Sequence, residues 1–342
     1  MREQGVRRLE EALEMRVRVS ESCFLSTDQL TPERRGQELN AVFADTRVAL
    51  VVSAIGGDDA IRVLRHLDLE TIAKNPKPFM GYSDATSLHL LLFELGVLSL
   101  YGGALLCQFG VGGPGMHAYT QESLLTALFG PRDAPVPVRP SDAFLDGYLD
   151  WSEPKNLKVA KDLEENPGWE WHNCPRADYD TKTGILWGGC LEVLFNHLAA
   201  RVCIPESDQL AGAVLFVETS EVFPPSHVVY SFFQCLGELG LLQGFAAVLV
   251  GRPQTVHRDT RAPPSRDAYR RDQKRAILRA ISEYTSPPLP VVFDLDFGHT
   301  DPQVFVPVGG TAHIYPHSRA ITFTYENAPR RRRRPFPARA GG

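Results

Sequence analysis

Ser83 stands where a serine could act as a nucleophile. It follows the apolar residues 78–80 and Gly81, and it precedes a segment with helical spacing. A serine on a sharp turn between a strand and a helix exposes its hydroxyl, and N–H groups at the start of the helix can hold an oxyanion. Gly81 permits close approach before the turn, and Asp84 can cap the helix and offer its N–H. The alternative is that Ser83 and Asp84 form an ordinary helix N-cap.

A glycine turn ends the apolar run that precedes this serine. The run covers residues 49–55 and is followed by Gly56, Gly57 and two aspartates. Neighbouring parallel strands end at the same sheet edge, and open α/β sheets bind their ligands there. The N–H groups of Gly56 and Gly57 could therefore complete an oxyanion hole beside Ser83. A tight turn with no catalytic role fits the local sequence equally well.

Two further residues have the chemistry and the position of site residues. Glu218 ends the apolar run 213–217, so a charge appears where a buried strand reaches the sheet edge. His299 lies in a turn between two predicted strands, where its ring can project and be held by a carboxylate. A solvated strand-end carboxylate and a surface histidine are the corresponding alternatives. None of the ten histidines forms a metal-ligand motif, so we expect neither a metal nor another cofactor.

Composition limits the classes of protein to be considered. The 342 residues are 43% hydrophobic and 23% charged, which is typical of a soluble globular protein. No segment has the length and apolarity of a membrane span or the pattern of a secretory leader. The six cysteines are scattered singly, as expected for free thiols in the reducing cytoplasm.

The charge distribution argues against a nucleic-acid-binding body. The formal net charge is -5, whereas phosphate recognition needs a concentrated basic surface. Five consecutive arginines, residues 330–334, are the exception. We expect the tail 328–342 to be disordered, with contact to a nucleic acid or an anionic surface as the less favoured alternative.

The elements that must position these residues follow from the apolar patterns. Helical spacing covers residues 6–13, 61–67 and 88–95, and residues 17–19 alternate as in a short strand. Continuous apolar strands that alternate with helices predict an α/β fold with a parallel sheet covered on both faces.

Prolines between residues 130 and 144 predict an interdomain linker. It divides an N-terminal domain, residues 1–129, from a C-terminal domain, residues 145–327. Within the second domain a helix is expected near residues 232–239. Apolar strands are expected at residues 213–217, 246–250, 290–293, 304–308 and 321–325.

Three of these segments together resemble a known family. Residues 75–86, 216–221 and 297–302 are similar to the nucleophile, glutamate and histidine segments of serine carboxypeptidases. That family includes LD-carboxypeptidases and the MccF-like microcin C self-immunity peptidases, and the resemblance runs from about residue 5 to residue 325. It implies a triad of Ser83, Glu218 and His299. It also implies a flavodoxin-like first domain, resembling class I glutamine amidotransferases, and a β-rich second domain of the swivelling type. Homodimers are common in the family.

Further site residues follow from the same resemblance. Residues 218–221, including Glu221, and the loop 166–169 look closer to the MccF-like branch, so the expected substrate is an aminoacyl-nucleotide amide. Trp169 or Trp171 could stack on its base, or could simply pack within the loop. Cys190 stands where relatives carry Asn after paired glycines, which predicts altered specificity if that position contacts substrate.

Two other functions remain as alternatives. A peptidoglycan LD-carboxypeptidase would act on a short peptide and not on a nucleotide. Family members usually begin with a strand that precedes the first helix, and this sequence starts at that helix. A non-catalytic binding protein that lacks the strand, and exposes an unpaired sheet edge, is therefore the alternative of another class.

Overall fold

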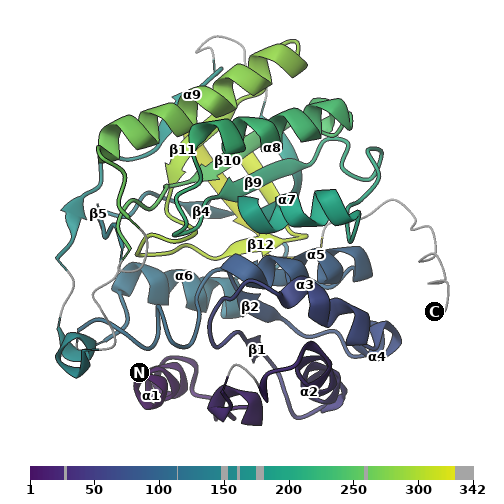
Figure 1. Cartoon of the computed structure of the whole chain (residues 1–342), viewed down its shortest axis with the longest axis vertical. Coiled ribbons are helices and arrows are strands. Elements are labelled where there is room, and N and C mark those ends of the chain that lie inside the picture. Colours follow the sequence, from purple (N-terminus) through teal and green to yellow (C-terminus); the bar gives the residue numbers. More distant parts are fainter. Residues whose placement is uncertain are drawn as a thin grey trace.

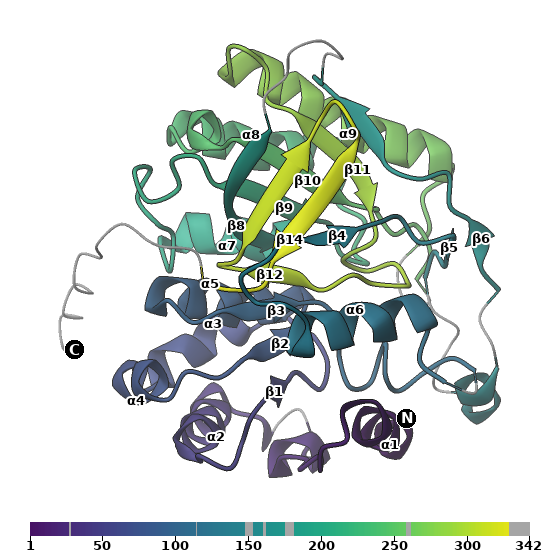
Figure 2. The same cartoon turned by 180° about the vertical axis from the view of Figure 1, so that it is seen from behind.

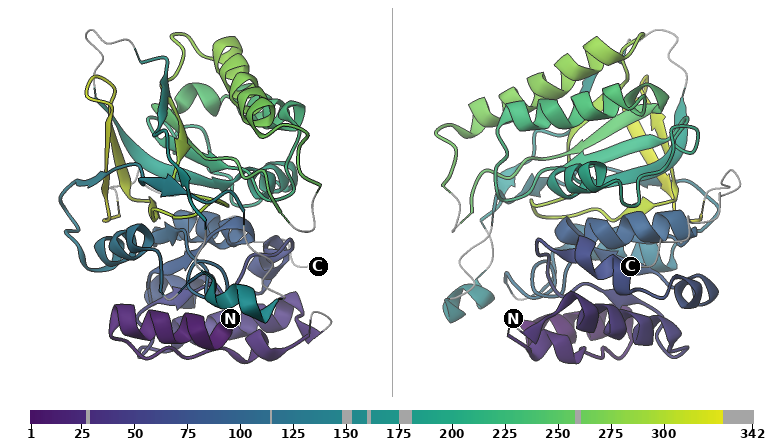
Figure 3. Two further views of the ribbon diagram at one scale, coloured as in Figure 1. Left: turned by 90° about the vertical axis from the view of Figure 1, so that its left-hand side faces the viewer. Right: turned by 45° about the vertical axis from the view of Figure 1, so that its right-hand side comes forward.

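The computed structural model describes residues 1–26, 29–113, 115–147, 153–159, 162–174, 181–257 and 261–327. Its strands form two main sheets, which lie in a lower and an upper layer in Figure 1 and stay stacked in both views of Figure 3. A small ribbon pairs β5 (Ala143–Phe144) with β6 (Glu164–Glu165). The expected α/β class is confirmed, although both main sheets are mixed and not purely parallel.

The first sheet has the order β1-β2-β3-β12. β1 (Val51–Val52), β2 (Phe79–Gly81) and β3 (Ser99–Tyr101) are parallel, and β12 (Val306–Val308) runs antiparallel to β3. Its helices are α1 (Arg2–Leu13), α2 (Pro32–Ala44), α3 (Ala60–Val63), α4 (Leu69–Lys74), α5 (Thr86–Leu95) and α6 (Ala118–Phe129). Because β12 comes from the second half of the chain, the two sheets do not separate at one point in the sequence. The division at residues 130–144 stays a prediction.

The second sheet has the order β4-β14-β13-β8-β9-β10-β11-β7. Its parallel centre is β8 (Lys182–Cys190), β9 (Val214–Glu218), β10 (Ala247–Gly251) and β11 (Val291–Leu295). Antiparallel strands flank it: β13 (Thr311–Tyr315), β14 (Ala320–Thr324) and β4 (Val136–Val138) on one side, β7 (Glu170–His172) on the other. α7 (Leu191–Ala200), α8 (Ser226–Glu238) and α9 (Arg266–Tyr284) cover one face, and Figure 2 shows β13 and β14 from the other.

Helix α5 joins the two layers. Its sequence predicts one apolar face, yet residues 86–93 are all buried, because the helix packs against β3 in one layer and against β8 and α7 in the other. Gly96, with φ of 73°, ends the helix in the left-handed conformation that glycine adopts without strain. The helix that follows Ser83 is thus fixed from both sides.

Two local predictions have different outcomes. The strand expected at residues 17–19 is wrong, because the first sheet begins at β1 and the N–H of Val17 donates to the Glu10 carboxylate at 2.9 Å. The proline-rich segment does contain β4, but as the edge strand of its sheet, where a missing N–H such as that of Pro137 is tolerated.

Several expectations concern the chain as a whole. In the described ranges no helix is long and apolar enough to cross a membrane. None of the six cysteines, which all lie in the described ranges, forms a disulfide bond. The arginine run 330–334 lies outside the described residues.

Candidate active site

Ser83 sits on a strained turn between β2 and α5. Its φ is 63°, which is unusual for a residue other than glycine and is a conformation that persists at functional sites. Gly81 makes the sharp turn possible, since a Cβ there would lie 2.8 Å from the Cβ of Ser53 and 3.0 Å from that of Ala85. The strand-turn-helix geometry expected for Ser83 is present.

Glu218 and His299 converge on this serine. Glu218 is the last residue of β9, and its Oε2 lies 2.7 Å from Nδ1 of His299. Nε2 of the same ring lies 3.1 Å from Ser83 Oγ. The carboxylate is 1% exposed and the histidine 4%, so the pair is shielded from water. A hydroxyl, an imidazole and a carboxylate in this order can transfer a proton away from the hydroxyl.

Glycines make room for the buried carboxylate. Gly298 has φ of 98°, and a Cβ there would come within 2.6 Å of Oε2 of Glu218. A Cβ on Gly251 would come within 2.8 Å of the Glu218 Cβ. The glycine before His299 is therefore part of the geometry that brings the histidine to the glutamate.

Tyr101 is a site residue that the sequence analysis missed. It is the last residue of β3 and fully buried, and its hydroxyl donates to Oε1 of Glu218 at 2.5 Å. The same hydroxyl accepts the backbone N–H of Ser83 at 3.1 Å. Its position at the end of β3, the strand next to β2, could have indicated that Tyr101 lies near Ser83.

The glycine turn lies directly over the nucleophile. A Cβ on Gly56 would be 3.1 Å from Ser83 Oγ, and one on Gly57 would be 3.0 Å from Asp84 Oδ2. Asp84 was expected to cap its own helix, but no side chain caps that helix. Its carboxylate instead accepts the N–H groups of Asp59 and Ala60 at 3.1 and 2.9 Å. Its buried carboxylate thus fastens the turn to the serine, and burial raises its pKa.

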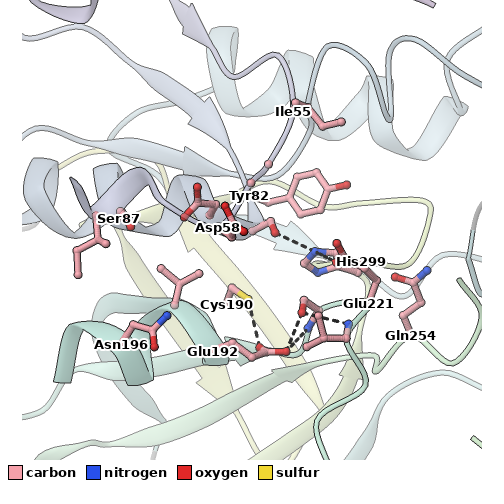
Figure 4. A pocket seen from close by; sticks show the side chains of 18 of the residues that line it. Ile55, Asp58, Tyr82, Ser87, Cys190, Glu192, Asn196, Glu221, Gln254 and His299 are labelled. Atoms are coloured by element: carbon pink, nitrogen blue, oxygen red, sulfur yellow. Dashed lines mark hydrogen bonds and ion pairs between the residues drawn. The ribbon is translucent and has the colours of Figure 1, made fainter. Parts of the chain in front are cut away.

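A cavity of about 600 Å³ opens between the layers beside these residues. Figure 4 shows Ile55 and Tyr82 of the first layer facing Glu192 and Glu221 of the second. The lining also includes Asp58, Asp84, Cys190, Val193, Asn196, Val222, Gln254 and His257.

Cys190 and Glu192 form one corner of this cavity. Sγ of Cys190 donates to Glu192 Oε2 at 3.3 Å, and the other carboxylate oxygen accepts from the Ser220 N–H and hydroxyl at 3.0 and 2.7 Å. Glu192 was missed in the sequence, although it lies two residues after Cys190. The paired glycines before Cys190 are required by packing, because a Cβ on Gly189 would be 2.5 Å from Thr86.

Glu221 contacts His299 from the side of the cavity. Its Oε2 lies 3.1 Å from Nε2 of His299. Burial alone would lower the pKa of His299, but Glu218 and Glu221 outweigh it and raise that pKa to about 10. The close contact with His299 lowers the pKa of Glu221 to about 2. Burial raises the pKa of Glu192, and the nearby Glu218 raises it further.

Trp169 and Trp171 lie outside the cavity lining. The indole N–H of Trp169 donates to Asp296 Oδ2 at 2.9 Å, and Trp171, on the edge strand β7, pairs with Val292 of β11. Both pack against the core. The structure gives them packing contacts and does not bring them to Ser83.

No three His, Cys, Asp or Glu side chains of the described residues are grouped so that they could hold a metal ion. The arrangement around Ser83 suits acyl transfer by side chains and backbone N–H groups.

Comparison with known proteins gives the family. Residues 1–102 match the LD-carboxypeptidase N-terminal domain, and residues 183–314 match the LD-carboxypeptidase C-terminal domain. Together these matches cover more than half of the chain, which therefore belongs to the LD-carboxypeptidase family.

Individual relatives share about a quarter of their residues with this chain. YocD of Bacillus subtilis is 27% identical over 84% of this chain and 79% of its own length. The microcin C7 self-immunity protein MccF of Escherichia coli is 26% identical over 86% and 79%. A solved MccF-like protein from Streptococcus pneumoniae, in complex with AMP, is 26% identical with a TM-score of 0.81 and covers 95% of this chain and 93% of its own.

Proposed function

We propose that this chain is a serine carboxypeptidase in which Ser83 is the nucleophile, His299 the general base and Glu218 the residue that orients the base. The observation that carries the proposal is the continuous contact from Glu218 Oε2 through the imidazole to Ser83 Oγ, at 2.7 and 3.1 Å. Membership of a carboxypeptidase family supports the reaction type.

The reaction we propose is acyl transfer to Ser83. His299 takes the hydroxyl proton while Oγ attacks the carbonyl carbon of an amide, and the N–H groups of Gly57 and Asp84 hold the resulting oxyanion. The imidazolium then gives its proton to the leaving nitrogen, and the C–N bond breaks. Water, deprotonated by the same histidine, hydrolyses the acyl-enzyme and restores Ser83. One oxyanion donor typically contributes on the order of 3 kcal/mol to such a barrier.

The substrate we propose is an aminoacyl-nucleotide amide, cleaved in the manner of MccF. A cavity of about 600 Å³ is large enough for a ligand of that size, and a relative of similar fold has been solved with AMP. Cys190 and Glu221 line this cavity and are proposed to contact the substrate. The family description favours a second candidate, a peptidoglycan LD-carboxypeptidase.

Mass spectrometry separates these possibilities. Purified protein is incubated with aspartyl sulfamoyl adenosine and, separately, with a muropeptide tetrapeptide, with Ser83→Ala as the matched control. Cleavage of the first compound alone supports the aminoacyl-nucleotide proposal, and cleavage of the tetrapeptide alone favours cell-wall recycling. If the wild-type protein cuts neither, the enzyme proposal fails and the non-catalytic binding protein becomes the better account.

A further inference from the structure

Glu221 competes with Ser83 for the same nitrogen of His299. Nε2 lies 3.1 Å from Ser83 Oγ and 3.1 Å from Glu221 Oε2, while Nδ1 faces Glu218. If Nδ1 donates to Glu218 in a neutral ring, Nε2 carries a lone pair, and a carboxylate oxygen beside a lone pair is repelled. If the ring is an imidazolium, Nδ1 donates to Glu218, Nε2 donates to Ser83 Oγ, and the positive charge of the ring attracts Glu221, whose buried Oε2 has no hydrogen-bond partner among the described residues. Two carboxylates beside one imidazole ring therefore correspond to a protonated His299.

A protonated His299 cannot accept the proton of Ser83. The high pKa of His299 and the low pKa of Glu221 agree with the geometry, since each charge stabilises the other. Glu221 must leave Nε2 before the histidine can act as a base. It is free to do so, because its side chain is 37% exposed and follows the end of β9, whereas the side chain of Glu218 is fully buried.

When Glu221 moves away from the His299 imidazolium, another positive charge would stabilise its carboxylate in the cavity. Among the described residues that line the cavity there is no lysine or arginine, whereas Asp58, Asp84 and Glu192 are acidic like Glu221. His257 is the other titratable side chain beside Glu221. A cation for Glu221 would therefore come most readily from the substrate.

We propose that Glu221 recognises a protonated α-amino group on the substrate and thereby releases His299 to act as the base. This rests on the function proposed above. The carboxylate and Ser83 Oγ both contact one nitrogen, so an ammonium on Glu221 and a carbonyl at Ser83 belong to a single aminoacyl residue. Glu221 is a specificity residue that selects acyl groups with a free α-amine, and it keeps the site inactive when none is bound.

The test compares two substrates that differ in one charge. They are aspartyl sulfamoyl adenosine and its N-acetyl derivative, measured with the wild-type protein, Glu221→Gln and the exposed control Glu206→Gln. The wild type should cleave the free amine about 10- to 100-fold more efficiently in kcat/KM, as expected for one charged hydrogen bond. In Glu221→Gln, kcat/KM should fall for the free amine and rise for the N-acetyl compound, whereas Glu206→Gln should keep the wild-type ratio.

A second readout does not depend on turnover. NMR titration of the His299 ring should show a lower pKa in Glu221→Gln than in the wild type, because one of its two carboxylate partners is neutral. If the wild type cleaves both compounds equally and Glu221→Gln leaves the ratio unchanged, the role of Glu221 is refuted while the proposed function stands. If the wild type cleaves neither compound, the proposed aminoacyl-nucleotide substrate is wrong and this inference fails with it, whereas the triad is then tested separately with the muropeptide tetrapeptide.

Discussion

The hydroxyl of Tyr101 donates to Glu218 at 2.5 Å and accepts the N–H of Ser83 at 3.1 Å. One buried side chain therefore fixes the backbone of the proposed nucleophile and the carboxylate that orients the proposed base. Burial and Glu218 hold the pKa of the Tyr101 phenol well above its usual value, so it stays a hydrogen-bond donor. It connects β3 of the first sheet to β9 of the second, and so holds the two layers in register at the site.

We predict that Tyr101→Phe lowers kcat roughly tenfold with little change in KM, because a hydrogen bond to a buried carboxylate is worth about 1.5–3 kcal/mol. Tyr101 does not line the cavity, so substrate binding should be preserved. Steady-state kinetics checks this. Tyr119→Phe, which removes a hydroxyl bonded to the Arg139 carbonyl, is the matched control and should leave both constants unchanged. A large rise in KM for Tyr101→Phe would contradict the positioning role.

A methyl group at Gly56 should block the site without unfolding the protein. The added Cβ would lie 3.1 Å from Ser83 Oγ, where the substrate carbonyl must approach. Gly56 does not have a left-handed φ, so alanine brings no backbone strain. We expect Gly56→Ala to lose most of its kcat/KM at an unchanged Tm. Wild-type activity in this variant would show that the glycine turn is not next to the reacting atoms.

The sequence predicted the local parts of this site better than the long-range ones. The turn at Ser83 and the strand that ends at Glu218 follow from apolar runs interrupted by polar residues, a pattern that reports local structure. Tyr101 and Glu192 were missed because each reaches the site from a different strand or helix. Their roles depend on how the two layers stack, and no spacing within one segment encodes that.

Other differences have the same physical origin. Asp84 was expected to cap its own helix, but tertiary packing places the start of α3 within reach of its carboxylate. β12 was predicted as a strand, yet its place beside β3 in the first sheet needs the whole fold. Trp169 was considered for base stacking, and its nearest polar partner is the buried Asp296.

Gly298→Ala should both destabilise and inactivate the protein. Its positive φ of 98° strains alanine, and the added Cβ would lie 2.6 Å from Oε2 of Glu218. We expect a loss of about 2–4 kcal/mol in unfolding free energy and little residual activity. Gly168→Ala is the matched control, because φ is 87° and no atom lies within 4 Å of the added Cβ. It should cost about 1 kcal/mol. Equal losses in denaturant unfolding would refute the steric explanation.

Because Glu218 and Glu221 both contact His299, the stability and the activity of the protein should depend on pH. Glu218 and Glu221 raise the pKa of His299 from 6.5 to about 10, and Glu192 lies near the same ring. The contribution of protonated His299 to the free energy of unfolding is fully present below pH 6.5, where the histidine of the unfolded chain is also protonated. This contribution is lost as the pH rises towards 10. Wild-type unfolding free energy should therefore fall across this window more than that of Glu221→Gln.

The rate should change in the opposite direction with pH. The acidic limb of the kcat/KM profile reports the pKa of the base in the free enzyme. For an N-acetylated substrate, kcat/KM should therefore rise with pH as His299 loses its proton. In Glu221→Gln the limb should move to lower pH. A limb at the same pH in both proteins would mean that Glu221 does not control protonation of His299.

The measurement that tests the proposed triad most directly is a kinetic cycle of Ser83→Ala, His299→Ala and the double variant, with kcat/KM determined on the substrate that the wild type cleaves. Residues that act as one unit give non-additive losses. We predict that each single variant loses at least about 10³-fold and that the double variant is no worse than Ser83→Ala alone. Retained activity in Ser83→Ala, or losses that add in full, would contradict the account.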